Sequence, residues 1–308
     1  MVGLPSDGAK NRGVPKTGLP RWFLETKAAV LTRADITTVL ELGAERGLTV
    51  KVNRWQAMIA AALSWGLAEG LLKTNEARGI RRRFEENVRE RSFTSDELAK
   101  IWHGISTLKA EESTKLATRL YVATPGLRPK ELCSLKRKNV RLDDVRPMLT
   151  VEKGEAKNRV EHVVPLSALS VELLREAMSS NADSEWVFPS AGGAPLTAAG
   201  LSRAIVKSRA LDETLFGVPD AQLYDVKHTM ITFLGDAGHT NDAIGVLFNH
   251  LTATKGSTTG KSYNHSRYLS LKTELVGKWA AYLDRTVGRT AASGNVLSIE
   301  TRRENVGA

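Results

Sequence analysis

The sequence has almost no cysteine: Cys133 is the single one in 308 residues. One thiol cannot form an intramolecular disulfide or a cysteine-rich zinc site, and this scarcity is typical of proteins that stay in a reducing cytosol. Long apolar runs are also missing, because the longest apolar stretch, residues 55–72, is interrupted by Gln56, Ser64 and Glu69. The N-terminal residues lack the apolar core of a secretory leader. We therefore expect a soluble, intracellular protein.

Several common catalytic and cofactor motifs are absent as well. The sequence contains no G-x-G-x-x-G or Walker A phosphate loop, no H-E-x-x-H zinc motif and no G-x-S-x-G nucleophile elbow. The segment GSTTGKS, Gly256–Ser262, resembles a phosphate loop, but its glycines are one residue too close together and no strand precedes it. Asp225 and His228 alone are poor evidence for a metal. We therefore expect neither a cofactor nor a metal ion.

Acidic residues are few relative to basic ones. The chain holds 44 Lys and Arg against 34 Asp and Glu, which gives a net charge of +10. Such an excess favours a polyanionic partner, and for a chain without a membrane span nucleic acid is commoner than a lipid surface. Nucleic acid is therefore the expected partner, and no membrane is expected.

Composition and hydrophobic periodicity divide the chain into four segments. Apolar residues at helical spacing begin near Arg33, and a second, longer series runs from Trp55 to Leu67. The arginine-rich stretch 79–93 has few apolar residues and predicts a linker, after which a capping box at residues 94–97 opens a second unit. The segments are a flexible basic tail (1–20), a helical unit with its linker (21–92), a larger unit (93–288) and a mobile C-terminal tail (289–308).

The larger unit is expected to be mainly α-helical with a small antiparallel β-sheet. Two apolar runs, 149–152 and 160–165, predict strands joined by a lysine-bearing turn. Helical spacing predicts the other elements, and Pro129 suits the first turn of one of these helices. The expected helices are 94–105, 114–123, 129–135, 171–178, 198–208, 225–236, 241–248 and 270–287.

The helix expected at 225–236 raises a question about its polar residues. On a helical wheel Tyr224, Lys227 and His228 share one side, opposite an apolar side. Two interpretations stay open: a solvated polar face, or a cluster that converges on a negatively charged group. The apolar side consists of Val226, Met230, Phe233 and Ala237.

Five short segments resemble, in the right order, the boxes of the tyrosine recombinase (phage integrase) family. TPGLRPKELCSL is similar to its first arginine box and KNRVEHVVPL to its lysine-bearing hairpin. YDVKHT stands at the position of its His-x-x-Arg, LFNH resembles its Leu-Gly-His box, and SYNHSRYLSLK resembles its nucleophile segment. The resemblance covers about residues 30–290 and implies the tyrosine recombinase catalytic fold, preceded at 21–92 by a truncated helical core-binding domain.

The resemblance implies a role for each matching residue. Arg128 binds the scissile phosphate, Lys157 protonates the leaving 5′ oxygen, His250 donates a hydrogen bond to the phosphate and Tyr263 is the nucleophile. Such a site needs no metal, because cationic side chains neutralise the phosphate. The residues expected in catalysis are Arg128, Lys157, Tyr224, Lys227, His250 and Tyr263, and those expected to bind DNA are Arg81, Arg82, Arg83, Lys153, Arg159 and His228.

Some of these assignments have competitors within a few residues. A tyrosine often has only a packing role, a lysine in a hairpin turn is solvated by default, and an arginine at a helix start can pair with a carboxylate. The competing assignments are Tyr268 for Tyr263, Lys153 or Arg159 for Lys157, and a Glu131 ion pair for phosphate binding by Arg128.

The clearest departure from the family pattern is Lys227, which stands where the family has its second arginine. A lysine keeps the charge but loses the planar fork, so it holds one phosphate oxygen where arginine holds two. Loss of one preorganised donor typically costs about 10²–10³ in rate. Lys227 is either native, marking an attenuated or noncatalytic relative, or engineered to trap a DNA complex, and the sequence leaves both open.

The resemblance therefore implies a site-specific recombinase, or integrase, that cuts and rejoins DNA through a 3′-phosphotyrosine intermediate and that Lys227 attenuates. The alternative is a catalytically inactive DNA-binding or regulatory paralogue of the same fold, and a type IB topoisomerase shares the chemistry. The implied assembly is a homotetramer on paired recombination sites, with accessory DNA-bending or directionality proteins. The expected location is the cytoplasm, in association with the nucleoid.

Overall fold

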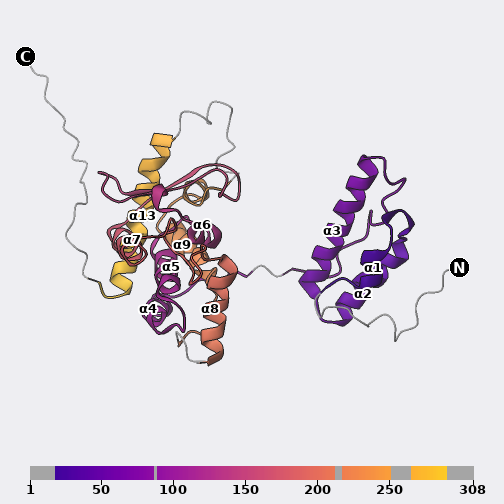
Figure 1. Ribbon diagram of the computed structural model, residues 1–308, viewed down its shortest axis with the longest axis horizontal. Coiled ribbons are helices and arrows are strands. Elements are labelled where there is room, and N and C mark those ends of the chain that lie inside the picture. Colours follow the sequence, from indigo (N-terminus) through magenta and orange to yellow (C-terminus); the bar gives the residue numbers. More distant parts are fainter. Residues whose placement is uncertain (1–17, 87–88, 212–216, 251–264, 290–308) are drawn as a thin grey trace, which may run out of the picture. The chain divides into compact units, whose positions relative to one another are not determined.

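The computed structural model describes residues 18–86, 89–211, 217–250 and 265–289. The chain divides into two compact units, Met1–Arg89 and Glu90–Ala308, which are seen in Figure 1 as an indigo helical group and a larger group coloured from magenta to yellow. The two tails expected from the sequence fall almost entirely outside the described residues. Each unit has its own hydrophobic core.

The described part of the first unit, residues 18–86 and 89, contains the α-helices α1 (Arg21–Glu25), α2 (Arg33–Glu45) and α3 (Thr49–Ala68). A capping box starts α2, in which the Thr32 hydroxyl accepts from the Asp35 backbone N–H and the Asp35 carboxylate accepts from that of Thr32. The two longer helices pack together through fully buried aliphatic and aromatic side chains. These include Ile36, Val39, Leu40, Val52, Trp55, Ile59 and Leu63.

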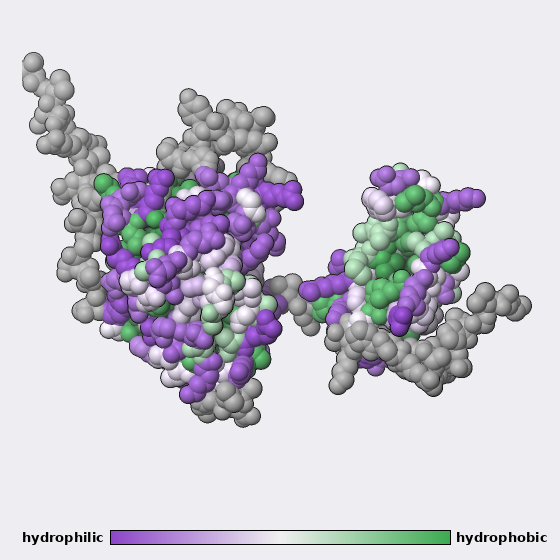
Figure 2. Space-filling view, in the orientation of Figure 1, coloured by the Kyte–Doolittle hydropathy of each residue, from purple (hydrophilic) through white to green (hydrophobic). Residues whose placement is uncertain are grey.

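Helix α3 also presents apolar side chains to the outside. Met58 is 53% exposed and Trp65 is 62% exposed, and Figure 2 shows hydrophobic residues gathered on this face of the first unit. The apolar series from Trp55 to Leu67 therefore does not form one buried stripe as the periodicity predicted, because Met58 and Leu67 point outward. Large exposed apolar patches mark surfaces that contact other molecules.

The stretch expected to be a linker, 79–93, begins as part of the first unit. The Asn53 amide on α3 donates to the Phe84 carbonyl at 2.7 Å, and its carbonyl oxygen accepts from the Arg83 N–H at 3.2 Å. Ile80 and Phe84 pack against the first core, whereas Phe93 lies in the second. Part of the expected linker, including Ile80 and Phe84, thus packs on the first unit, because the buried Asn53 supplies hydrogen bonds that hold this irregular backbone in place.

The second unit contains one described sheet of three antiparallel strands in the order β1-β2-β3. The strands are β1 (Val140–Arg141), β2 (Met148–Val151) and β3 (His162–Pro165), with Leu149 opposite Val164 and Val151 opposite His162. Both predicted strands are confirmed, and β1 is an addition that the sequence analysis missed. Residues 152–161 form the hairpin turn between β2 and β3 and carry Lys157.

The other described elements of the second unit are mainly α-helices (Figure 1). They are α4 (Ser95–Gly104), α5 (Glu112–Ala123), α6 (Pro129–Cys133), α7 (Ala168–Ser180), α8 (Ala198–Leu211), α9 (Asp225–Asp236), α10 (Asn241–Leu247) and α13 (His265–Thr286). The predicted capping box of Thr94 and Glu97 begins α4. The mainly α class with a small antiparallel sheet is thus confirmed.

Two contacts fix the long helix α13 inside the second unit. The Trp279 indole N–H donates to the Val122 carbonyl of α5 at 2.9 Å, and the Lys272 ammonium donates to the Val163 carbonyl of β3 at 2.8 Å. Burial lowers the pKa of Lys272 to about 8. Helix α13, which contains the C-terminal part of the expected nucleophile segment, is therefore attached both to the helical core and to the sheet.

Candidate active site

The loop that carries Arg128 depends on a glycine. After α5 the chain turns at Gly126, whose φ of +101° is a conformation that side-chain-bearing residues rarely adopt. A Cβ atom here would lie 2.7 Å from the Leu247 backbone oxygen, at the end of α10. Only glycine therefore lets the Arg128 loop approach α10 this closely. Arg128 follows directly as the N-cap residue of α6, and Pro129 occupies the first turn.

Arg128 connects three parts of the second unit. Its Nη1 donates to the Glu131 carboxylate at 2.9 Å, and its Nη2 donates to the carbonyls of Phe248 and Asn249 at 3.2 and 3.5 Å. Glu131 is only 2% exposed and also accepts from the Arg128 backbone N–H at 3.0 Å. The competing Glu131 ion pair therefore exists, but a guanidinium has five N–H donors, so the pair leaves room for a phosphate.

Lys227 does not lie on a solvated face. It is 7% exposed, and its Nζ lies 3.3 Å from Nε2 of His250. The same ammonium lies 5.1 Å from the centre of the Phe248 ring and 5.6 Å from that of Tyr224. Burial, followed by the positive charges of Arg128 and Lys157, lowers the pKa of Lys227 to about 8. The solvated-face interpretation was thus wrong for Lys227, because α10 and its following turn cover that side of α9.

The other two residues of the Tyr224 group are more open. Tyr224 is 49% exposed and its ring meets that of His228 edge to face, with 5.3 Å between ring centres. His228 is half-buried. The Tyr224 ring is therefore more open to solvent than the Lys227 side chain that it neighbours.

His250 is a partly buried ring among cations. Burial lowers its pKa, and the charges of Lys227, Arg128 and Lys157 lower it further. The ring is therefore neutral near pH 7. Its Nε2 accepts from the Lys227 ammonium, which places the remaining ring proton on Nδ1.

The β2–β3 hairpin brings Lys157 to the same place. Its backbone N–H donates to Glu131 at 3.4 Å, and its side chain is exposed. Because Glu131 also pairs with Arg128, this bond holds the Lys157 backbone next to the Arg128 side chain, and the Lys157 charge lowers the pKa of both Lys227 and His250. Lys153 and Arg159 are also exposed in this turn. The described residues of the predicted catalytic set, Arg128, Lys157, Tyr224, Lys227 and His250, are thus brought together.

The remaining predicted residues are Tyr263 and three arginines of the first unit. Tyr263 falls in 251–264, outside the described residues, whereas its competitor Tyr268 is part of α13. The three arginines at 81–83 are exposed in the first unit, where Arg83 pairs with Glu41 at 3.4 Å.

Three residues around the site were not assigned a catalytic or DNA-binding role from the sequence. Asn249 has φ of +50° directly before His250. His162 on β3 is fully buried, and its Nε2 lies 2.9 Å from the Leu247 carbonyl oxygen. Burial holds the pKa of His162 well below its usual value. Glu131 was considered only as a competitor for Arg128. The signal that could have identified His162 is its position in the second predicted strand, opposite the buried Val151 of the first.

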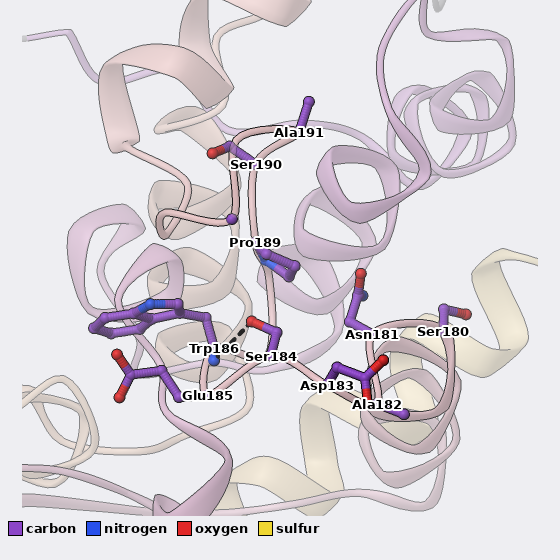
Figure 3. A pocket seen from close by; sticks show the side chains of 11 residues that line it. Ser180, Asn181, Ala182, Asp183, Ser184, Glu185, Trp186, Pro189, Ser190 and Ala191 are labelled. Carbon is purple, nitrogen blue, oxygen red and sulfur yellow. Dashed lines mark hydrogen bonds between the residues drawn. The ribbon is translucent and has the colours of Figure 1, made fainter.

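The second unit has a surface hollow that contains none of these residues. It measures about 490 Å³ and lies between the end of α7 and the following loop (Figure 3). Asp183 and Glu185 line it, and the Ser184 hydroxyl accepts from the Trp186 N–H at 3.1 Å. Two carboxylates at its wall disfavour a phosphate ligand, so this hollow is not a candidate for DNA.

The described part of the chain contains neither a metal-binding cluster nor a membrane-spanning helix. No group of at least three His, Cys, Asp or Glu side chains there could hold a metal ion. No described helix is long and apolar enough to cross a membrane. Burial raises the pKa of the Cys133 thiol to about 12, so this cysteine is chemically inert.

Comparison with known proteins relates the chain to integrases. Residues 91–269 match the family model described as Phage integrase family. The chain is 26% identical over 247 residues to an integrase of Shigella phage Sf6 and to prophage integrase IntS of Escherichia coli strain K12. Each alignment covers 79% of this chain and 61% of the relative. The chain thus spans about three fifths of the length of these curated relatives.

Solved structures with the same fold include lambda integrase. Lambda integrase bound to DNA gives a TM-score of 0.57 at 21% identity, over 79% of this chain and 85% of that one. A lambda integrase tetramer bound to a Holliday junction gives 0.56 at 21% identity, over 82% and 70% of the two chains. At these identities the likeness concerns the fold alone. Because the family model covers more than half of the chain, this protein belongs to the phage integrase family of tyrosine recombinases.

Proposed function

We propose that this protein is a site-specific DNA recombinase that cuts and rejoins DNA through a 3′-phosphotyrosine intermediate. The observation that carries the proposal is the meeting of Arg128, Lys227 and His250, which come from three separate loops and helices. The Arg128 guanidinium binds the backbone next to His250, and Lys227 lies 3.3 Å from the His250 ring. Such a gathering of cations suits a phosphate with developing negative charge.

The proposed roles follow from the chemistry of each side chain. The Tyr263 oxygen attacks phosphorus and its phenol proton passes to solvent water, so that a phosphotyrosine bond forms and the bond to the 5′ oxygen breaks. Lys157 gives a proton to that leaving oxygen, because an exposed ammonium on a hairpin can reach it. Arg128 neutralises the non-bridging oxygens bidentately, and Lys227 and His250 complete the phosphate site. Rejoining reverses these steps without an external energy source.

We propose that Lys227 attenuates the reaction. Its ammonium is a point donor where a guanidinium would hold two phosphate oxygens. Its pKa of about 8 also leaves part of the population uncharged slightly above neutral pH. Both effects weaken transition-state stabilisation more than ground-state binding, so DNA binding survives while cleavage slows.

Double-stranded DNA is the proposed substrate of both units. Arg81, Arg82 and Arg83 of the first unit, and Lys153, Arg159 and His228 of the second, contact the DNA in this proposal. The related lambda integrase forms a tetramer on a Holliday junction, and a homotetramer on paired sites is proposed for this chain. Accessory DNA-bending or directionality proteins, and a cytoplasmic, nucleoid-associated location, belong to the same proposal.

The test is covalent trapping on a nicked suicide substrate. The target site is first obtained by mapping the DNA that flanks the gene. A protein–DNA adduct that Tyr263→Phe abolishes and Tyr268→Phe retains supports the proposal and the choice of nucleophile. Adduct formation that persists in Tyr263→Phe contradicts it. Because Tyr268 is a tyrosine in the adjacent helix, it is a matched control.

The second candidate function, a noncatalytic DNA-binding or regulatory protein, is favoured by Lys227 alone. The variant Lys227→Arg separates the two. An adduct that appears or accelerates by at least about tenfold in Lys227→Arg supports an attenuated enzyme. Tight, site-specific binding without an adduct in either protein supports the binding protein. Relaxation of supercoiled DNA without sequence preference would instead identify a type IB topoisomerase.

A further inference from the structure

Two asparagines tie the lysine-bearing hairpin to the loop before His250. The Asn158 amide donates to the Asn249 backbone carbonyl at 2.7 Å. In return the Asn249 amide donates to the Asn158 side-chain carbonyl and to the Val160 backbone carbonyl, each at 3.2 Å. The bonds join residues about 90 positions apart in the sequence, so they are tertiary contacts and not part of a local turn.

The backbone at Asn249 explains why an asparagine can make this contact. Its φ of +50° lies in the left-handed region, which asparagine tolerates better than other residues with a side chain. The Leu-Gly-His box that LFNH resembles has glycine at this position. Glycine adopts the same backbone conformation but has no side-chain amide. Asn249 therefore allows the same turn and adds side-chain hydrogen bonds to the hairpin. The residue is only 4% exposed.

The same asparagine is connected to Arg128. Its backbone carbonyl accepts from both Asn158 and the Arg128 guanidinium, at 2.7 and 3.5 Å. Glu131 makes a parallel connection, because it accepts from Arg128 at 2.9 Å and from the Lys157 backbone N–H at 3.4 Å. The hairpin is thus held at the backbone of Lys157 itself, by Glu131, and directly after it at Asn158 and Val160, by Asn249.

We propose that Asn158 and Asn249 are positioning residues that dock the β2–β3 hairpin, and with it Lys157, beside Arg128 and His250 before DNA binds. This inference rests on the proposed function for the role of Lys157, but docking itself does not depend on catalysis. A loop as exposed as 152–161 otherwise samples many conformations, and fixing it in advance spares that ordering cost when substrate arrives. The lysine is then within reach of the leaving oxygen as soon as the phosphate binds.

The first test measures docking without any reaction. Backbone hydrogen exchange of residues 153–160 is followed by mass spectrometry in the unchanged full chain and in the variant Asn249→Gly. This variant keeps the left-handed turn and removes only the side-chain amide. We expect exchange in this segment to rise by about tenfold, since two side-chain hydrogen bonds are lost. Unchanged exchange in the hairpin overturns the proposal.

A matched control removes a comparable amide elsewhere. The Asn181 side chain donates to the Ala177 carbonyl at 2.8 Å at the end of α7, away from the hairpin in sequence and in contacts. Asn181→Ala should leave exchange of residues 153–160 unchanged. An equal rise in Asn181→Ala would mean that the change reports general loosening, and it would also overturn the proposal.

The second test asks whether docking serves proton transfer. Cleavage is compared on the ordinary substrate and on one with sulfur in place of the leaving 5′ oxygen, because a thiolate leaves without a proton. For Asn249→Gly we expect about a tenfold loss on the oxygen substrate and less than about a twofold loss on the sulfur substrate. Equal losses on both would show a merely structural role and contradict the proposal.

Failure of the proposed function gives a different pattern from failure of this inference. A protein that cleaves neither substrate contradicts the recombinase proposal, while the hydrogen-exchange comparison still decides whether the two asparagines dock the hairpin. Normal cleavage with unchanged exchange in Asn249→Gly leaves the recombinase proposal intact and overturns the inference.

Discussion

The ammonium of Lys227 lies 3.3 Å from Nε2 of His250, and the two residues belong to different elements, α9 and the turn after α10. Both side chains have a lowered pKa, for the same first reason, burial, and both are lowered further by Arg128 and Lys157. The cluster therefore concentrates positive charge. Among the groups that influence the pKa of Lys227, Glu131 is the negative one that offsets this charge. A bound phosphate would relieve this repulsion. Phosphate binding should therefore depend on whether Lys227 is protonated, and the pH dependence of cleavage can measure this.

Cleavage at low substrate concentration should fall as the pH rises through about 8. The pKa of Lys227 in the free protein is about 8, so its ammonium binds phosphate below this pH and is lost above it. Because kcat/KM reports the free enzyme, it should decrease about tenfold per pH unit above the break. The measurement is the second-order rate of adduct formation from pH 6.5 to 9.5.

The control for this profile is Lys227→Arg, since a guanidinium stays protonated throughout the range. Its rate should be flat across pH 8. A break at the same pH in the variant would show that another group titrates, and the assignment to Lys227 would fail.

Replacing Gly126 by alanine should damage both stability and the site. The new Cβ would lie 2.7 Å from the Leu247 oxygen at a φ of +101°, so the Arg128 loop must move or strain. We expect a loss of about 1–3 kcal/mol in the free energy of unfolding. Displacement of Arg128 by about 1 Å would slow cleavage by about a hundredfold. Denaturant unfolding and adduct kinetics measure the two effects.

Gly277→Ala is the matched control for this substitution. Gly277 lies inside α13, and nothing is within 4 Å of the position that its Cβ would take. Alanine in a helix interior is favoured over glycine by about 1 kcal/mol, so this variant should gain stability and keep its activity. The same loss in both variants would refute the steric argument at Gly126.

Local patterns in the sequence were enough to locate most elements. The bounds of α9, Asp225–Asp236, were predicted as they are found, and the capping residues Thr94 and Glu97 marked the start of α4. Both patterns depend on neighbours within one or two helical turns. The two-residue strand β1 was missed because so short a segment has no periodicity of its own.

Features that depend on distant residues could not be predicted in this way. The burial of Lys227 comes from Phe248 and His250, and the docking of Phe84 comes from Asn53. The resemblance to a family did place Arg128, Lys227 and His250 in one site. It gave no account of Asn249, because the family pattern has glycine there.

Salt dependence of DNA binding should identify the phosphate contacts of the first unit. Arg81 and Arg82 are exposed, and each should release about one counterion when it binds a phosphate. Arg81→Ala or Arg82→Ala should therefore reduce the slope of log K against log salt by about 1 and weaken binding about equally on cognate and unrelated DNA. The slope is measured by fluorescence anisotropy between 50 and 300 mM salt, roughly the range over which phosphate contacts dominate.

Arg21→Ala is the control for these arginines. Arg21 is another exposed arginine of the first unit, and its Nε pairs with Glu25 at 2.6 Å, so its charge is already balanced. Its removal should leave the slope unchanged. An unchanged slope in both Arg81→Ala and Arg82→Ala would exclude these residues as phosphate contacts.

Acid stability should depend on His162. Its pKa is held well below the ordinary value of 6.5, chiefly by burial, so the folded protein keeps the ring neutral while the unfolded chain takes up a proton. A lowered pKa in the folded state gives stability that is present above pH 6.5 and is lost as the pH falls toward the folded value. A second ring proton would also reside on Nδ1, a buried atom without a hydrogen-bond partner in the described structure.

In His162→Gln the side-chain amide can still donate a hydrogen bond to the Leu247 carbonyl, but this amide does not titrate. Below pH 6.5 the wild-type free energy of unfolding should fall relative to the variant by up to about 1.4 kcal/mol per pH unit. The difference is measured by urea unfolding at a series of pH values from 7.5 to 4.5, which runs from about one unit above to about two units below the ordinary histidine pKa. The exposed His103 provides the comparison, since His103→Gln should follow the wild-type curve. Parallel curves for wild type and His162→Gln would mean that protonation of the buried ring does not contribute to acid unfolding.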